Sequence, residues 1–186
     1  MGIFSRKFSY FQIFLFLVVF TLIGLIVYFS VNNTKTGNCV SEIKQVVLRG
    51  ESLSGLLEPG AELKILIDYY KCHTVQRNDV VAYNYAGNEV PIIKIVKGVE
   101  GDKFELKKSG DCWNVLINNE VVKNSQELSH CFNEQGHKML SLYERDYKGV
   151  IPQNTYLILG NLVSGTLDST KFGLIDKGNI LGRVIY

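Results

Sequence analysis

The N-terminal part of the chain carries its longest hydrophobic run. Residues 11–31 contain no Asp, Glu, Lys, Arg or His. At 1.5 Å per residue a helix of this length spans about 31 Å, which matches the hydrocarbon core of a bilayer. A cleavable leader is the alternative, but its apolar run is normally shorter and precedes a small-x-small site, which the segment after Tyr28 does not offer. The pattern therefore predicts one uncleaved transmembrane anchor over 11–31.

The charges that flank this run predict its orientation. Arg6 and Lys7 precede it, whereas the first basic residue after it is Lys35. Because basic flanks tend to stay in the cytoplasm, residues 1–10 are expected there. Everything beyond a polar linker at 32–41 is then expected on the extracytoplasmic side of the cell membrane.

After this linker the hydrophobic pattern changes to short runs rich in β-branched and aromatic residues. Turn residues separate the runs, and Asn118-Asn119 marks a hairpin. The runs cover residues 43–49, 62–70, 79–85, 90–99, 102–108, 112–122, 155–161 and 182–186. Only 124–148 has a pattern that permits much helix, and that pattern is weak. We expect residues 42–186 to form one mostly β extracytoplasmic domain.

Four cysteines lie on the expected outer side, where disulfides persist. They are Cys39, Cys72, Cys112 and Cys131. Four cysteines permit three pairings, and we favour Cys112–Cys131 because these two bracket the expected hairpin and a loose connection. Four free thiols are the alternative.

Composition narrows the classes of function. The chain has 186 residues and a net charge of +2, and no Lys/Arg stripe is interleaved with aromatic residues, so no nucleic-acid partner is expected. No CxxC or His-rich spacing is present, so neither a metal site nor a cofactor is predicted. His73, His130 and His137 are expected on the surface.

The stretch "VVLRGESLSGLLEPG" (46–60) contains a candidate nucleophile, Ser52. It follows a strand, beside Gly50, in a loop with an unusual number of leucines. From local sequence alone, a serine that bonds its own turn is the better interpretation. Ser52 does not begin an S-x-x-K motif, because Gly55 stands in the lysine position. Leu53, Leu56 and Leu57 either pack in the core or contact the membrane interface.

A candidate base lies in "VPIIKIVKGVEGD" (90–102). Strand alternation places Lys94 on one face with Ile92 and Val96. If that face is buried, desolvation lowers the lysine pKa, as a general base requires. The alternative is an edge-strand lysine that discourages aggregation, a role that Lys97 suits better.

A third segment, residues 155–173, runs from an apolar strand into a loop of Gly, Ser, Thr and Asp. Thr166 could orient a neutral lysine by hydrogen bonding, and Asp168 or Ser169 could brace the loop. An ordinary polar loop would have the same composition.

Together the three segments resemble the bacterial-type signal peptidase I family, whose members are membrane-anchored Ser/Lys endopeptidases. "GESLSGLLEPGA" keeps Gly50, Ser52 and Gly60 of the motif G-x-S-M-x-P-T-L-x-x-G-D. "IIKIVKGVEGD" resembles I-K-R-V-V-G-x-P-G-D and aligns Lys94 with the general-base lysine. Residues 160–173 follow the spacing of G-D-N-x-x-x-S-x-D-S-R-x-x-G, which matches Thr166, Asp168 and Ser169. The resemblance spans the anchor and nearly all of residues 43–186.

Several positions depart from these motifs. Gly55, Leu56 and Ala61 replace the proline, threonine and aspartate of the first motif, and no catalytic atom is lost. Ile95 and Asn161 replace a basic and an acidic residue of the motifs. Because both of these opposite charges are absent from this chain, no unpaired charge remains. Thr170 replaces an arginine that usually pairs with the aspartate matched by Asp168, and Lys171 is the candidate substitute. Such divergence also fits a specialised, conjugation-type pilin-processing peptidase.

The resemblance implies a reaction and a substrate. Lys94 would take the proton of Ser52, which attacks the end of a signal peptide and forms an acyl-enzyme. Gly50 stands where some relatives use a hydroxyl in the oxyanion hole. The implied partners are signal peptides of exported preproteins with small residues at −1 and −3, membrane lipid and the secretion translocon. One alternative is a catalytically inactive, anchored β-domain that binds exported proteins. The other is a self-cleaving repressor-type protease, and the predicted anchor argues against it.

Overall fold

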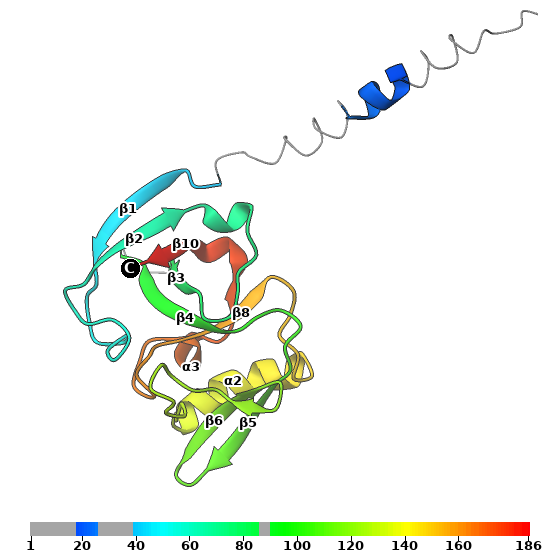
Figure 1. The fold of residues 1–186 in the computed structure, drawn as a ribbon. Coiled ribbons are helices and arrows are strands. Elements are labelled where there is room, and N and C mark those ends of the chain that lie inside the picture. Colours follow the sequence, from blue (N-terminus) through cyan, green and yellow to red (C-terminus); the bar gives the residue numbers. More distant parts are fainter. Residues whose placement is uncertain (1–17, 26–38, 86–89) are drawn as a thin grey trace, which may run out of the picture. The chain divides into compact units, whose positions relative to one another are not determined.

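The computed structural model describes residues 18–25, 39–85 and 90–186 (Figure 1). The chain divides into two units, residues 1–38 and 39–186. In the first unit, residues 18–25 are helical. Among the described residues, no helix has the length and apolar character needed to cross a bilayer. The predicted anchor and linker lie largely outside the described residues, so both stay predictions.

The second unit consists mainly of antiparallel strands, which confirms the predicted mostly β character. The strands are β1 (Glu42–Val47), β2 (Glu62–Ile67), β3 (Val80–Tyr83), β4 (Ile92–Gly98), β5 (Phe104–Ser109), β6 (Cys112–Ile117), β7 (Glu120–Val121), β8 (Thr155–Leu159), β9 (Ile175–Asp176) and β10 (Ile180–Ile185). The helices are α2 (Glu134–Asp146) and α3 (Ser169–Phe172), and the 3-10 turns are η1 (Tyr69–Lys71) and η2 (Lys177–Asn179).

Seven strands form one sheet in the order β1-β2-β10-β3-β4-β8-β9, and β5-β6-β7 form a second sheet. In β2 the buried Leu63 and Ile65 alternate with exposed Glu62 and Lys64, as the pattern predicts for a strand with one face in the core. Strand β4 lies between β3 and β8 and is mostly buried. It therefore carries its lysines inside the sheet.

The predicted hairpin turn and the helix that the weak pattern permits are both found in the structure. Asn118 and Asn119 have φ angles of 51° and 72° and form the two-residue turn between β6 and β7. Helix α2 falls within the predicted 124–148 segment, and the Asn133 side chain caps it by accepting from Gly136 N. Hairpin β5–β6 and α2 lie together at the end of the unit opposite β1 and β2 (Figure 1).

Two disulfides are present, so the free-thiol alternative is wrong. Cys112–Cys131 confirms the favoured pairing, and Cys39–Cys72 is the second bond. The Cys112–Cys131 bond joins β6 to the segment that precedes α2. Next to it, Cys131 N donates to Val163 O at 2.8 Å, so the disulfide also borders the loop after β8.

Candidate active site

Ser52 lies in a closed loop that follows β1. Hydrogen bonds of 2.9 Å from Leu48 N to Ala61 O and from Gly60 N to Leu48 O join the two ends of this loop. Gly50, with φ at +76°, adopts a left-handed conformation that a residue with a side chain rarely takes. The backbone therefore turns sharply just before Ser52.

The leucines of this loop belong to the core. Leu53 is completely buried, and Leu56 and Leu57 are partly buried against the same cluster, which includes residues of β2, β3, β4 and β10. Core packing is therefore the role of Leu53, whereas Leu56 and Leu57 pack on the core and keep part of their surface exposed, so their contact with the membrane interface stays a prediction. This packing attaches the loop to the sheet that carries the second candidate residue.

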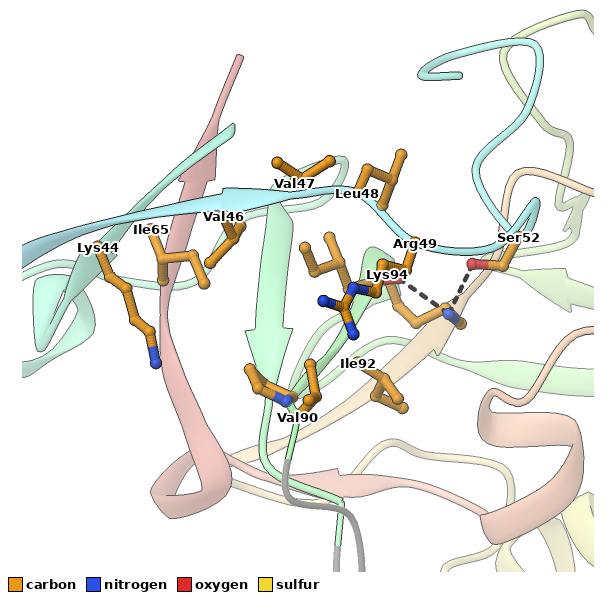
Figure 2. Close-up of a pocket in the computed structure, with 12 residues that line it drawn as sticks. Lys44, Val46, Val47, Leu48, Arg49, Ser52, Ile65, Val90, Ile92 and Lys94 are labelled. Carbon is orange, nitrogen blue, oxygen red and sulfur yellow. Dashed lines mark hydrogen bonds between the residues drawn. The ribbon is translucent and has the colours of Figure 1, made fainter. Parts of the chain in front are cut away.

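Lys94 reaches this loop from β4. Its Nζ lies 2.9 Å from Ser52 Oγ and donates to Ile93 O at 2.9 Å (Figure 2). Lys94 is only 4% exposed and its amine contacts Ser52, so the alternative of a lysine that extends into solvent to discourage aggregation is wrong for this residue. Two residues that are 42 positions apart in the chain are thus in direct contact.

Burial changes the acid–base character of Lys94. Desolvation of the ammonium lowers its pKa from 10.5 to about 8, while the negative charge of Asp168 acts in the opposite direction. A lysine with this pKa is partly neutral near physiological pH. It can therefore accept a proton from a hydroxyl in contact with it.

The loop after β8 contains the three supporting candidates, and Asp168 organises it. This buried carboxylate accepts from Thr166 Oγ1, Gly160 N, Thr170 N and Thr170 Oγ1. The Thr166 hydroxyl therefore donates to Asp168, whereas Lys94 bonds to Ser52 and Ile93. Thr170 itself partners the aspartate, so the expectation of a substitute at the exposed Lys171 is not met. The buried Ser169 accepts from Ile158 N at 2.9 Å and fixes the loop to β8, as a bracing residue does.

A pocket of about 590 Å³ lies beside the two central residues. Its lining is mostly apolar and comes from β1 and the loop after it, from β2, and from the start of β4 with the two residues before it: Lys44, Val46, Val47, Leu48, Arg49, Ser52, Ile65, Val90, Pro91, Ile92, Ile93 and Lys94. Figure 2 shows Ser52 and Lys94 at one end of this pocket and Lys44 toward the other end. An elongated ligand can therefore lie along β1 with one end at Ser52 Oγ.

Three polar residues lie deeper in the protein than the sequence indicated. His130 was expected on the surface but is 3% exposed, and burial lowers its pKa to about 4. Lys97, expected at a strand edge, is 9% exposed and donates to Asn78 Oδ1 at 3.3 Å. Asn161 is fully buried and its side chain donates to Ser54 O in the Ser52 loop. The sequence identified it only as the replacement of an acidic residue and did not indicate this contact. Within the described ranges, no group of three or more acids, histidines and cysteines could hold a metal ion.

Comparisons with known proteins identify the family of this chain. The family model for signal peptidase, peptidase S26, matches residues 9–186. Signal peptidase IB of Staphylococcus aureus strain Mu50 / ATCC 700699 is 30% identical over 146 residues, which are 75% of this chain and 74% of that protein, and its counterpart in strain N315 gives the same values. A solved signal peptidase I from Enterococcus faecalis V583 is 20% identical, with a TM-score of 0.39, over 60% of this chain and 97% of that one. The chain belongs to the signal peptidase S26 family.

Proposed function

We propose that this chain is a membrane-anchored serine endopeptidase that removes signal peptides from exported preproteins. Ser52 is the nucleophile and Lys94 is the general base. The observation that carries this proposal is the 2.9 Å contact between Lys94 Nζ and Ser52 Oγ, made by a lysine that is 4% exposed. Membership of the signal peptidase S26 family supports the class of substrate.

The reaction follows from this contact. Neutral Lys94 takes the Ser52 proton while Oγ attacks the scissile carbonyl, and the same proton then goes to the leaving amine. Neutral Lys94 next takes a proton from water, which attacks the acyl-enzyme. That proton returns to Ser52 Oγ as the cleaved signal peptide leaves with a free carboxyl group, which loses its own proton to solvent. Burial of Lys94 keeps enough of it neutral to begin each cycle.

The backbone N–H of Ser52 supplies part of the oxyanion hole. Within the described part of the chain it donates no hydrogen bond, whereas Ser52 O accepts from Asn161 N and Leu162 N. Gly50 offers no side-chain donor. One well-placed donor lowers such a barrier by about 3 kcal/mol.

The substrate lies extended in the apolar pocket. Among the described strands β1 pairs with β2 alone, and the part of β4 before Ile95 pairs with β3 alone. Each strand therefore offers backbone groups to an extended peptide, which gains main-chain hydrogen bonds in this way. Small residues at −1 and −3 fit this pose, because the peptide must approach closely to place its carbonyl at Ser52.

Thr166, Asp168 and Ser169 have supporting roles in this proposal. Asp168 holds the loop after β8 by four hydrogen bonds, and its negative charge favours the protonated Lys94 that forms during attack. Thr166 orients Asp168, and Ser169 fixes the loop to Ile158. None of the three takes part in covalent chemistry.

The predicted anchor at 11–31 gives the enzyme its place in the cell membrane. Residues 1–10 lie in the cytoplasm, and residues 42–186 face the extracytoplasmic side. There the cleavage sites of preproteins emerge from the translocon, and membrane lipid surrounds the anchor.

Cleavage of a membrane-bound precursor with an Ala-x-Ala site tests the proposal. The wild type is compared with Ser52→Ala and Lys94→Met, and Lys97→Met is the matched control because it removes a buried amine from the same strand. We expect cleavage by the wild type and by Lys97→Met only. Cleavage by all four forms would exclude the Ser52/Lys94 pair, and no cleavage by the folded wild type would favour an inactive binding domain.

A further inference from the structure

Asn161 joins the nucleophile loop to two other segments. Its backbone N–H donates to Ser52 O at 2.6 Å, and its side-chain Nδ2 donates to Ser54 O at 2.9 Å. The same Nδ2 donates to Ser125 Oγ at 2.9 Å, and Oδ1 accepts from Ser125 N at 3.0 Å. With its side chain fully buried, Asn161 bonds through every polar side-chain atom.

These partners determine which way the amide points. A backbone N–H can only donate, so Ser125 N requires the oxygen of the side chain. A backbone carbonyl can only accept, so Ser54 O requires the NH₂ group. An ionised aspartate, which has nearly the same size, has only acceptors and cannot satisfy both demands. A carboxylate at this position would turn a second acceptor toward Ser54 O inside the protein, which is costly without a donor between them.

The segment behind Asn161 is itself firmly held. Asn124 is 6% exposed, and its Nδ2 donates to Asn161 O at 3.0 Å, while its Oδ1 accepts from Gln126 N at 2.9 Å. Ser125 Oγ also donates to Gly55 O at 3.2 Å. The turn at 124–126 is therefore a fixed support to which Asn161 attaches both ends of the Ser52–Ser54 segment.

We propose that Asn161 is a positioning residue that keeps Ser52 Oγ against Lys94 Nζ. Its backbone and side chain hold the carbonyls of Ser52 and Ser54, and these two bonds fix the peptide planes that direct the Ser52 side chain. The motif that this chain resembles has an acid at this position. The hydrogen bonds in this protein require the amide, so a return to the acid damages the site. The catalytic readout of this inference rests on the proposed function.

The test compares Asn161→Asp with Asn114→Asp in the full-length chain, purified in detergent and assayed on a signal-peptide-derived peptide. Asn114 is the matched control, because it is 9% exposed and its Nδ2 also donates to a backbone carbonyl, that of His130. We expect Asn161→Asp to lower kcat by about tenfold to a hundredfold and to change KM by less than about twofold, since a shift of about 1 Å at the reacting atoms has that effect. Asn114→Asp keeps both constants. Equal kcat values for Asn161→Asp and the wild type would overturn the proposal.

Hydrogen exchange separates this inference from the proposed function. In Asn161→Asp, amides in segments 52–57 and 124–128 should exchange faster, while those of β5 and β6 should not change. Unchanged exchange in both segments would overturn the inference, whatever the activity. If exchange is faster in Asn161→Asp but the wild type cleaves no substrate, the positioning role of Asn161 is supported and the proposed peptidase activity is refuted. Ser125→Ala, at an exposed position, provides a milder variant for which we expect kcat to fall by about threefold.

Discussion

Raising the pH from about 7 to about 9 should raise kcat/KM about tenfold, because only neutral Lys94 can accept the Ser52 proton. Burial lowers the pKa of Lys94 to about 8. The neutral fraction is then about one-tenth at pH 7 and about nine-tenths at pH 9. With the ordinary pKa of 10.5, activity would still rise about tenfold per unit at pH 9 and would show no plateau below pH 10.

The assay measures kcat/KM for a peptide without titratable side chains between about pH 5 and pH 10, because this constant reports the free enzyme. Asp168→Asn provides an internal check. Loss of that carboxylate removes the charge that raises the Lys94 pKa, so the midpoint should move to lower pH even if the rate falls. A flat profile, or a midpoint near the ordinary lysine value, would refute the reasoning.

Three further predictions concern stability and packing. Lys94→Met should raise the free energy of unfolding by up to about 3 kcal/mol at neutral pH, because the Lys94 pKa is about 8 in the folded state and 10.5 in the unfolded state, so the buried ammonium costs stability below pH 8. Wild-type stability rises between pH 8 and pH 10.5, so the difference between variant and wild type in urea unfolding should be smaller at pH 10 than at pH 7. An equal difference at both pH values would contradict this. Gly160→Ala should lower kcat by about tenfold or more, since the new Cβ would lie 2.7 Å from Ser52 O and must displace the loop; wild-type turnover would show that the loop tolerates the shift. Replacing Cys112 and Cys131 by alanine opens a bond with a sequence separation of 19 and should lower the free energy of unfolding by about 3 kcal/mol; an unchanged denaturant midpoint would argue against this contribution.

The features that follow from neighbouring residues could be predicted from the sequence. Alternation along β2 and the Asn118-Asn119 turn depend on local backbone preferences, and the structure contains both. The apolar neighbours of Lys94 on the strand made its burial one of two open interpretations, and the structure shows that it is buried. Its contact with Ser52 did not follow from these neighbours, because the two residues are 42 positions apart and only the order of the family motifs related them.

The features that depend on tertiary packing could not be predicted. Thr166 donates to Asp168, because the backbone after β8 turns the two side chains toward each other. His130 is buried by segments remote in the chain, so its local sequence gave no signal of its burial. For Leu53 the sequence left core packing and membrane contact open, and the tertiary fold buries it. Asn161 replaces a charged residue of the motif. Its side chain donates to Ser54 O and accepts from Ser125 N, and this double role could not be predicted because both partners are remote in the chain.

Trapping the acyl-enzyme tests the central claim most directly. The full-length protein is mixed with a peptide substrate, quenched in acid during turnover, digested and examined by mass spectrometry. The account predicts that the segment containing Ser52 gains the mass of the N-terminal substrate fragment, and that Ser52→Ala and Lys94→Met show no such gain. Turnover by the wild type without an adduct on Ser52, or substrate cleavage by Ser52→Ala, would contradict it.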